Sequence, residues 1–358
     1  MQSDLLVAIG LSYDETMNQS RYDRQIRLSM IGQAGQDRLE NAHVAILGCG
    51  ALGTVAADIL ARAGVGHLKL IDRDVVEWTN LQRQSLFTEQ DARQGRAKAD
   101  AACEAIGRAN SQIRCEPLVA DVTSDNIASL LEGCDLVVDA ADNFAVRFLL
   151  NDYSLEQKLP WVHGGCIETG GQIAFFSGKG KPCFRCFVPQ PPPASSVPTC
   201  DSAGVLGAAT HMIASLQAAE AIKWLTGSLS AIREGVFSID LWSNRSRQIT
   251  LPLSLSADCP ACGKGRRDYL ASSGGNHASV VCGRLAVQLS PVAGRPVDLA
   301  AVIGRWQSMG EVTSNRFFAR LKVSEAESLT LFRDGRALIE GTSDISRART
   351  VYAQVVGE

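Results

Sequence analysis

Residues 44–53 read VAILGCGALG, and the rest of the chain is best interpreted outward from them. Four apolar residues, typical of a buried parallel strand, lead directly into a Gly-x-Gly-x-x-Gly motif formed by Gly48, Gly50 and Gly53. The alanine-rich segment 54–63 follows and is expected to be helical. The first glycine permits a tight turn, the second lets the backbone approach a phosphate, and the third lets the helix pack on the strand. The stretch therefore predicts the start of a nucleotide-binding βαβ unit.

A second strand is expected over residues 67–71, and it ends at Asp72. In nucleotide-binding βαβ units, an acid at the end of this strand accepts hydrogen bonds from ribose hydroxyls. The N–H groups at the start of the helix would face the phosphate oxygens. This fingerprint indicates a nucleotide but does not specify the chemistry.

Composition excludes several classes of protein. The chain has 358 residues, of which 46% are hydrophobic and 20% charged, so it can bury a substantial core. A net charge of −3 without basic runs gives no indication of nucleic-acid binding. The N-terminus lacks the basic start of a secretory signal, and the apolar segment 203–225 carries enough polar residues to be a buried core helix rather than a membrane span. Eleven cysteines without a signal indicate metal binding, catalysis or inert thiols in the reducing cytoplasm, not a disulfide framework.

The residues after Asp72 favour a triphosphate over a dinucleotide. Arg83 offers a bidentate fork to phosphate oxygens, and Asn80 supplies a neutral donor beside it. Lys98, at the start of an expected helix, can add a point charge. The alternative is that Lys98 is a solvated lysine at a helix start, where a cation is less favourable than an anion.

Two further segments carry charged candidates. A strand expected over 135–140 is followed by Asp142, which lies at the carboxyl end where open α/β sheets bind ligands. Asp142 could coordinate Mg²⁺ beside phosphates, or serve as a helix N-cap, or do both. Near the N-terminus, Arg24 belongs to the arginine-rich segment 21–28, which spacing alone favours as a solvated helix face.

Two Cys-x-x-Cys pairs give the strongest metal signal. They are Cys183 with Cys186 and Cys259 with Cys262. Four thiolates fill a tetrahedral Zn²⁺ site with no open position, so the predicted zinc is structural. A redox role for either pair is disfavoured because two matched pairs are present.

One further cysteine is a candidate nucleophile. Cys200 follows the proline-rich segment 188–198, which is predicted to be an irregular loop. A buried, inert thiol explains Cys200 equally well. His163 has no visible partner in the sequence and is interpreted as a packed histidine.

The C-terminal part is expected to form a separate module. Residues 266–278 are polar and glycine-rich and are interpreted as a linker. A small α+β module is predicted over 279–358, with helices at 299–309 and 345–355 and a hairpin turn at Asp334-Gly335. Its Cys282 is best explained as a packed strand cysteine.

Several motifs in order resemble the MoeB/ThiF family of adenylyltransferases, the bacterial relatives of ubiquitin-activating enzymes. The motifs are Arg21-Tyr22-x-Arg24-Gln25, Gly48-x-Gly50-x-x-Gly53, Asp72-x-Asp74-x-Val76, Asn80-Leu81-x-Arg83-Gln84, Ala141-Asp142-Asn143 with Arg147, and the two Cys-x-x-Cys pairs. The resemblance covers roughly residues 18–264. It implies a doubly wound, Rossmann-like mixed sheet over residues 1–265, a structural zinc and a homodimer. It also implies an enzyme that uses ATP to adenylate the C-terminal glycine of a ubiquitin-like sulfur carrier ending in Gly-Gly.

The resemblance also implies roles for individual residues. ATP would be bound by the glycine turn and by residues around it: Gly48, Gly50, Ala51, Gly53, Asp72 at the ribose, and Asn80, Arg83 and Lys98 at the phosphates. Asp142 would coordinate Mg²⁺, and Arg24 would reach into the ATP site of the partner subunit. Cys200 would take part in transferring sulfur from a cysteine desulfurase or a rhodanese, but not in forming the adenylate. Residues 279–358 do not resemble the rhodanese domain that some relatives carry.

Two other functions are compatible with parts of the pattern. An NAD(P)-dependent oxidoreductase would explain the glycine motif and Asp72, but would leave Asn80, Arg83 and Asp142 without a role. A non-catalytic partner subunit of an activating enzyme would be expected to lack the phosphate-binding residues, which are present here.

Overall fold

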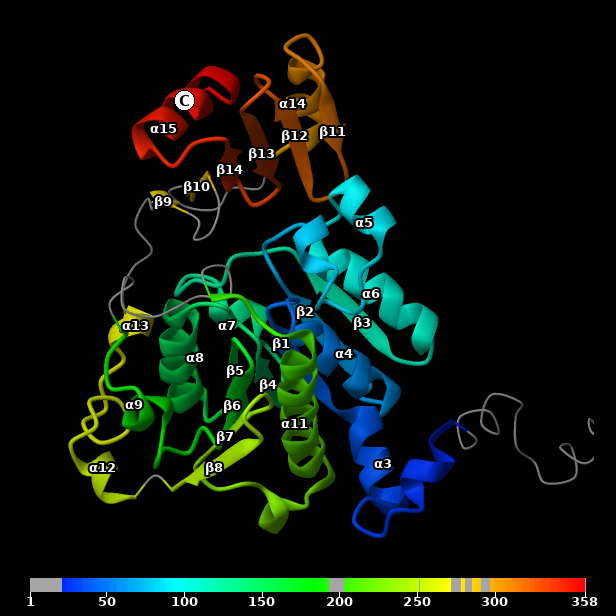
Figure 1. Ribbon diagram of the computed structural model, residues 1–358, viewed down its shortest axis with the longest axis vertical. Coiled ribbons are helices and arrows are strands. Elements are labelled where there is room, and N and C mark those ends of the chain that lie inside the picture. The colour runs from blue at the N-terminus through cyan, green and yellow to red at the C-terminus, as the bar shows by residue number, and fades with distance from the viewer. Residues whose placement is uncertain are drawn as a thin grey trace, which may run out of the picture. The chain divides into compact units, whose positions relative to one another are not determined.

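The computed structural model describes residues 21–192, 203–250, 252–271, 278–280, 285–290 and 297–357. Contacts within it divide the chain into two compact units, with the main boundary after Ala271 (Figure 1). Each unit has its own hydrophobic core. The predictions for Cys200, Cys282 and residues 1–20 fall outside the described residues.

The first unit is built on an eight-stranded sheet with the order β3-β2-β1-β4-β5-β6-β7-β8 (Figure 1). Neighbouring strands from β3 to β5 run parallel, and those from β5 to β8 run antiparallel. The predicted doubly wound mixed sheet is therefore confirmed. The strands are β1 (His43–Leu47), β2 (His67–Ile71), β3 (Arg114–Leu118), β4 (Leu136–Asp139), β5 (Trp161–Ile167), β6 (Gly170–Phe176), β7 (Val236–Asp240) and β8 (Arg245–Ile249).

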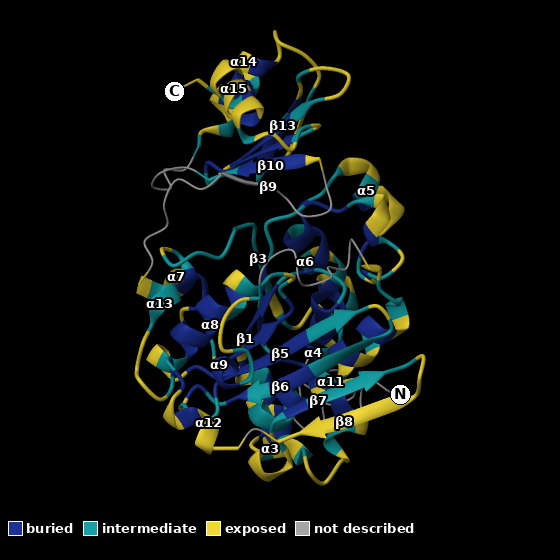
Figure 2. Ribbon diagram, turned by 60° about the vertical axis from the view of Figure 1, so that its left-hand side comes forward, coloured by how far each residue is buried: buried dark blue, intermediate teal, exposed yellow. Residues whose placement is uncertain are grey.

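Helices cover both faces of this sheet, which explains why the central strands are apolar on both sides. In β1, Val44 and Ile46 pack toward one core, and Ala45 and Leu47 pack toward the other. Buried residues follow the central strands, whereas the edge strand β8 is exposed (Figure 2). The helices are α3 (Gly32–Asn41), α4 (Gly53–Arg62), α5 (Glu89–Gln94), α6 (Lys98–Ala109), α7 (Ile127–Leu130), α8 (Phe144–Gln157), α9 (Phe184–Phe187), α11 (Gly207–Thr226), α12 (Ser254–Ala257) and α13 (Asp268–Ala271), with 3₁₀ turns η1 (Trp78–Asn80) and η2 (Leu229–Ala231).

The second unit is an antiparallel sheet with the order β11-β12-β13-β14-β10-β9 and two helices. Leu329 and Leu331 of β13 belong to the core shared with these helices, while Ser328 and Thr330 alternate with them along the strand. The elements are β9 (Ala278–Val280), β10 (Ala286–Leu289), α14 (Leu299–Trp306), β11 (Val312–Ser314), β12 (Phe318–Lys322), β13 (Ser328–Phe332), β14 (Ala337–Glu340) and α15 (Ile345–Val355).

Two features differ from the sequence-based expectation. Residues 268–271, expected within a linker, form α13 and belong to the first unit. Cys103 and Cys115 form a disulfide, although the cysteines were expected to be thiols or metal ligands. Their pairing depends on α6 lying against β3, which brings their Cα atoms to 5.4 Å, and sequence spacing does not reveal this. Within the described residues, no helix has the length and apolar content needed to cross a bilayer.

Candidate active site and cysteine cluster

The glycine turn between β1 and α4 is shaped by close backbone contacts. A Cβ atom at Gly53 would lie 1.8 Å from the Gly48 carbonyl oxygen, so a side chain is excluded there. Gly48 has a φ of +95°, which favours glycine. A Cβ atom at Gly50 would instead meet nothing closer than Gln84 Nε2 at 3.9 Å. The turn therefore leaves space at its second glycine, where the protein backbone is predicted to approach a phosphate.

Two features suit this space to a phosphate group. No side chain caps the N-terminus of α4, and although the Thr54 N–H donates to the Gly50 carbonyl at 3.1 Å, a helix start without a side-chain cap is suited to an anion. The Gln84 side chain is buried, and its Nε2 atom, a hydrogen-bond donor, is the atom nearest the space at Gly50.

Asp72 lies directly after β2 and holds the glycine turn. Its carboxylate accepts hydrogen bonds from the backbone N–H groups of Cys49 at 2.6 Å and Asp74 at 2.7 Å. Burial raises the pKa of the Asp72 carboxyl, and the positive charge of Lys98 acts in the opposite direction. Asp72 therefore lies directly after its strand, as predicted, between the glycine turn and Lys98, and its role at a ribose stays a prediction.

Lys98 is buried at the start of α6. Its Nζ atom lies 3.4 Å from Asp74 Oδ2, and its side chain is only 6% exposed. The interpretation of Lys98 as a solvated lysine is wrong, because α6 directs it toward the two acids that follow β2. Sequence reasoning missed Asp74, although its place in Asp72-x-Asp74 could have indicated it.

Asp142 is not the residue that caps α8. The N-cap of α8 is Asn143, whose Oδ1 atom accepts a hydrogen bond from the Val146 N–H at 3.0 Å. The exposed Asp142 carboxylate accepts a hydrogen bond from Asn143 Nδ2 at 3.1 Å. Burial alone would lower the pKa of Arg73, but Asp121, Asp74 and Asp142 together raise it, so Asp142 lies within electrostatic reach of the Asp72 loop.

The other two predicted phosphate ligands lie in the turn after this loop. Asn80 is buried, and its Oδ1 atom accepts the Glu77 N–H at 3.0 Å, which closes a capping box around η1. Arg83 donates from Nη1 to the Thr79 carbonyl at 2.7 Å. A Cβ atom at Gly207 would lie 3.8 Å from Arg83 Cβ, so the start of α11 packs beside this arginine.

Arg24 lies on a helical segment, residues 21–26, that is fixed to the first unit by other side chains. The Tyr22 hydroxyl accepts a hydrogen bond from Asn110 Nδ2 at 2.8 Å, and Gln25 Nε2 donates to the Ala63 carbonyl at 2.9 Å. The Arg24 side chain is 92% exposed, and its Nε atom lies 4.0 Å from Asp23 Oδ2. The structure does not bring Arg24 to the other candidate residues of the same chain.

His163 is packed, as predicted, but it has a partner. Its Nδ1 atom lies 2.8 Å from Asp139 Oδ2, and burial lowers its pKa. The assumption that it stands alone is wrong, because β4 and β5 are neighbours and place the two residues side by side. Asp139, as the last residue of β4, could have been found from the rule that ligands bind at strand ends.

The four predicted metal ligands converge in one cluster. The Sγ atoms of Cys183, Cys186, Cys259 and Cys262 all lie within 4.8 Å of one another. The Cys183–Cys259 and Cys186–Cys262 sulfur distances are 3.6 and 3.4 Å. A zinc ion bound at about 2.3 Å would place four sulfurs about 3.8 Å apart, so the cluster fits this metal.

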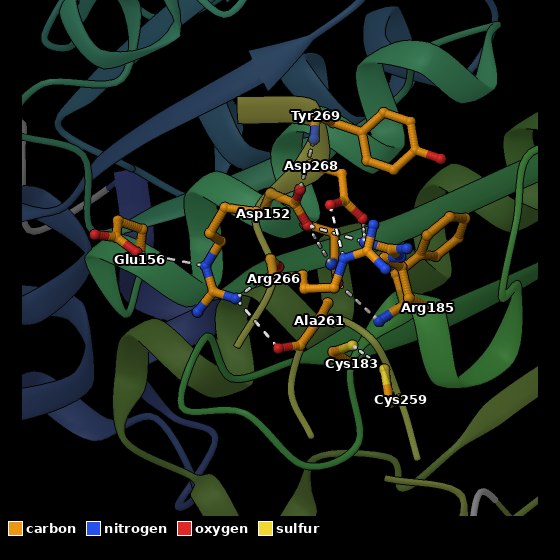
Figure 3. Close-up of polar contacts among 12 residues, drawn as sticks. Asp152, Glu156, Cys183, Arg185, Cys259, Ala261, Arg266, Asp268 and Tyr269 are labelled. Carbon is orange, nitrogen blue, oxygen red and sulfur yellow. Dashed lines mark hydrogen bonds and ion pairs between the residues drawn. The ribbon is translucent and has the colours of Figure 1, made fainter. Parts of the chain in front are cut away.

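Polar contacts connect α13, which follows the second cysteine pair, to the rest of the first unit (Figure 3). Arg185 donates from Nη1 to Asp268 Oδ2 at 3.1 Å, and its guanidinium lies 5.3 Å from the Tyr269 ring centroid. Asp152 of α8 accepts a hydrogen bond from the Tyr269 N–H at 3.0 Å. The cysteine cluster, α8 and α13 are thus connected directly.

The chain is similar to known proteins over most of its length. The model of the ThiF family matches residues 22–261, more than half of the chain. The chain belongs to the ThiF family. The match includes the glycine turn, Asp72, Lys98 and Asp142.

Relatives within the ThiF family extend beyond this range. The chain is 38% identical over 338 residues to the sulfur carrier protein ThiS adenylyltransferase of Bacillus subtilis, covering 94% of this chain and 99% of that protein. It is 42% identical over 243 residues to adenylyltransferase and sulfurtransferase MOCS3 of Culex quinquefasciatus, covering 68% of this chain but 55% of the relative. The chain therefore spans about half the length of the MOCS3 relatives. A crystal structure of E. coli MccB with AMPCPP and MccA matches with a TM-score of 0.58 and 25% identity, covering 68% of this chain and 74% of MccB.

Proposed function

We propose that this chain is an adenylyltransferase that activates the C-terminal glycine carboxylate of a ubiquitin-like sulfur carrier with ATP. The observation that carries the proposal is the site itself, in which a helix start without a side-chain cap follows Gly50. Asp72 and Lys98 lie beside this turn, and the exposed Asp142 carboxylate is not used as a helix cap. The B. subtilis relative, which matches almost the whole chain, is named a sulfur carrier protein adenylyltransferase. MccB, whose structure holds AMPCPP, an analogue of ATP, shares the fold.

The reaction joins the carboxylate oxygen to the α-phosphorus of ATP and breaks the bond to the bridging oxygen, so pyrophosphate leaves. The attacking carboxylate is ionised at neutral pH and needs no general base. The protein must offset repulsion between two anions and hold them in line. Lys98, Arg83 and the N–H groups of α4 supply positive charge, and Asn80 supplies a donor.

Asp142 is the residue suited to Mg²⁺. An exposed carboxylate is a preferred Mg²⁺ ligand beside phosphates, and Asn143 leaves it free by taking the capping role. The ion, when bound, neutralises phosphate charge. Zinc in the cluster of four cysteines would be structural, since no ligand position is left open.

The direct test is ATP–pyrophosphate exchange with the full chain, offered separately each candidate sulfur carrier. Exchange that requires the terminal Gly-Gly of one carrier is expected, and a carrier lacking its last two residues is the matched control. Absence of exchange with every carrier, despite Mg²⁺-dependent ATP binding, would contradict the proposal and favour a non-catalytic partner subunit. A melting-temperature gain with NAD but not with ATP would favour an oxidoreductase instead.

Two further residues are proposed to act elsewhere: one at the ATP site of a second copy, the other after the adenylate has formed. Arg24, exposed on its anchored helix, would reach the ATP site of a second copy in a homodimer. After adenylation, Cys200 would either attack the acyl-adenylate to form a thioester, releasing AMP, or accept the outer sulfur of a donor persulfide, releasing the donor thiol. Cys200→Ala should retain pyrophosphate exchange and lose sulfur transfer; loss of exchange in the folded variant would show that the two roles are not separate.

A further inference from the structure

A buried polar cluster lies behind the candidate nucleotide site, at the end of β4. Asp139 is fully buried, and its Oδ2 atom accepts hydrogen bonds from His163 Nδ1 at 2.8 Å and Arg147 Nε at 3.3 Å. Burying a carboxylate is costly unless it is paired and hydrogen-bonded. The Asp139 carboxylate is paired with two side chains, although the second ring nitrogen of His163, Nε2, is buried without a hydrogen-bond partner. Three polar side chains thus occupy a buried place that apolar residues could fill at a lower desolvation cost.

The cluster holds the peptide that carries Asp142. Asp139 Oδ1 accepts the Ala141 N–H at 3.1 Å, and Arg147 Nη2 donates to the Ala141 carbonyl at 2.6 Å. Both polar groups of the residue before Asp142 are therefore fixed by charged side chains. The same Arg147 nitrogen reaches the Gly164 carbonyl at 3.1 Å, which ties the turn to β5.

Two other elements contact this part of the chain. Gln217 of α11 is fully buried and donates from Nε2 to the carbonyls of Asp139 at 2.7 Å and Val162 at 3.2 Å. The glycine turn also approaches the residue after Asp139, since a Cβ atom at Gly48 would lie 2.6 Å from the Ala140 carbonyl oxygen. The turn after β4 is thus clamped between the cluster and the glycine turn of the nucleotide site.

We infer that Asp139, Arg147 and His163 are positioning residues that orient the Asp142 carboxylate for the Mg²⁺–ATP complex. The inference rests on the proposed function. None of the three needs to touch the nucleotide, because they act through the Ala141 peptide. A merely structural cluster would affect ATP binding equally with and without Mg²⁺, whereas a positioning cluster affects the Mg²⁺-dependent part.

The test uses Arg147→Lys in the full chain. Lysine keeps the charge beside Asp139, but a single ammonium cannot reproduce the planar fork that reaches Asp139, Ala141 and Gly164 together. ATP affinity is measured by calorimetry in Mg²⁺-free buffer without chelator and again with Mg²⁺, alongside zinc content and melting temperature. We expect unchanged affinity without Mg²⁺ and a roughly tenfold smaller gain on adding Mg²⁺, as for other residues that orient a metal ligand.

Arg233→Lys is the matched control, because Arg233 lies beside another buried carboxylate, Glu220 of α11. It should keep the full Mg²⁺ gain even if its melting temperature falls. Equal loss of ATP affinity with and without Mg²⁺ in Arg147→Lys, or an unchanged Mg²⁺ gain, would overturn the inference.

A second pair of variants covers the case in which Arg147→Lys does not fold. His163→Asn keeps a donor for Asp139 and should retain most of the Mg²⁺ gain, whereas His163→Leu removes the donor and should lose it. Equal Mg²⁺ gains in these two variants would also overturn the inference. If the wild-type chain shows no Mg²⁺ gain at all, the proposed function fails rather than the assignment of the cluster.

Discussion

Asp142 and Asn143 are adjacent residues that divide two tasks between them at the start of α8. Asn143 caps the helix, and Asp142 leaves its carboxylate exposed. Either residue type can cap a helix, so the sequence did not separate the two tasks. The hydrogen bond from the Val146 N–H decides between them.

This division predicts opposite effects from two neighbouring substitutions. Asn143→Ala should lower the free energy of unfolding by about 1 kcal/mol through loss of the cap. Asp142→Asn should leave stability nearly unchanged but reduce Mg²⁺-dependent pyrophosphate exchange by on the order of 10²-fold, the loss typical of one preorganised electrostatic contact. Urea denaturation and exchange assays on both variants check this. The converse pattern, with Asp142→Asn destabilised and still active, would restore Asp142 as the cap.

Lys98 is a buried cation beside the acids after β2, where Arg73 also lies 3.9 Å from Asp74. Lys98→Met should reduce exchange by roughly 10²- to 10³-fold, because methionine fills similar volume without the charge. Asp72 and Asp74 would then lie near the proposed phosphate site without the charge of Lys98. Arg93→Met, at an exposed pair with Glu89 on α5, is a suitable control and should exchange normally. Similar activity in both variants would remove Lys98 from the site.

Local chemistry explains which of these residues could be predicted from the sequence. Spacing in the sequence predicts the glycine turn, Asp72 and the four cysteines, because turn geometry and metal coordination require those residue types. Asp139 and His163 are 24 residues apart and meet only because β4 and β5 pair. Likewise, the burial of Lys98 depends on where α6 starts relative to β2.

Whole elements were predicted best where local signals agreed. The helix expected over 345–355 is α15 with the same bounds, since Asp344 caps it and its apolar residues recur at helical spacing. The short helix α13 was missed because its order depends on contacts from Asp152 and Arg185, which come from α8 and the first Cys-x-x-Cys pair. A polar segment without such neighbours would be a linker.

The cysteine cluster should make the segment around α9 and α13 dependent on metal. Burial raises the pKa of the Cys183 thiol, and it raises that of Cys262 to about 11, so without metal these thiols are protonated at neutral pH. Zinc binds thiolates, so its binding must release protons, and acidification must weaken it. We expect one zinc per chain and loss of zinc as the pH falls.

Proton release is measured by titrating zinc into the metal-free protein in buffers of different ionisation enthalpy. Cys259→Ser should lower zinc content, lower the melting temperature and expose the 261–271 segment to proteases, since the cluster and α13 are connected through Arg185. Ala271→Ser, which introduces a serine at an exposed position outside the cysteine cluster, is a suitable control and should change none of these properties. A wild-type chain that carries no zinc when purified under reducing conditions without chelator would contradict the assignment.

The molecule as a whole consists of two units with separate cores, and this predicts two unfolding events. Leu331 is fully buried in the core of the second unit, so Leu331→Ala should destabilise that unit by about 2–5 kcal/mol. Removal of zinc and addition of ATP with Mg²⁺ should instead move the transition of the first unit, down and up respectively. Scanning calorimetry of the full chain under these conditions checks the assignment, with pyrophosphate exchange as a second readout.

Leu331→Ala should lower one transition while exchange at 25 °C persists, because every proposed ATP ligand lies in the first unit. A single transition that shifts with all three changes would mean that the two cores fold cooperatively, and the second unit would then have to be counted as part of the structure that supports the site.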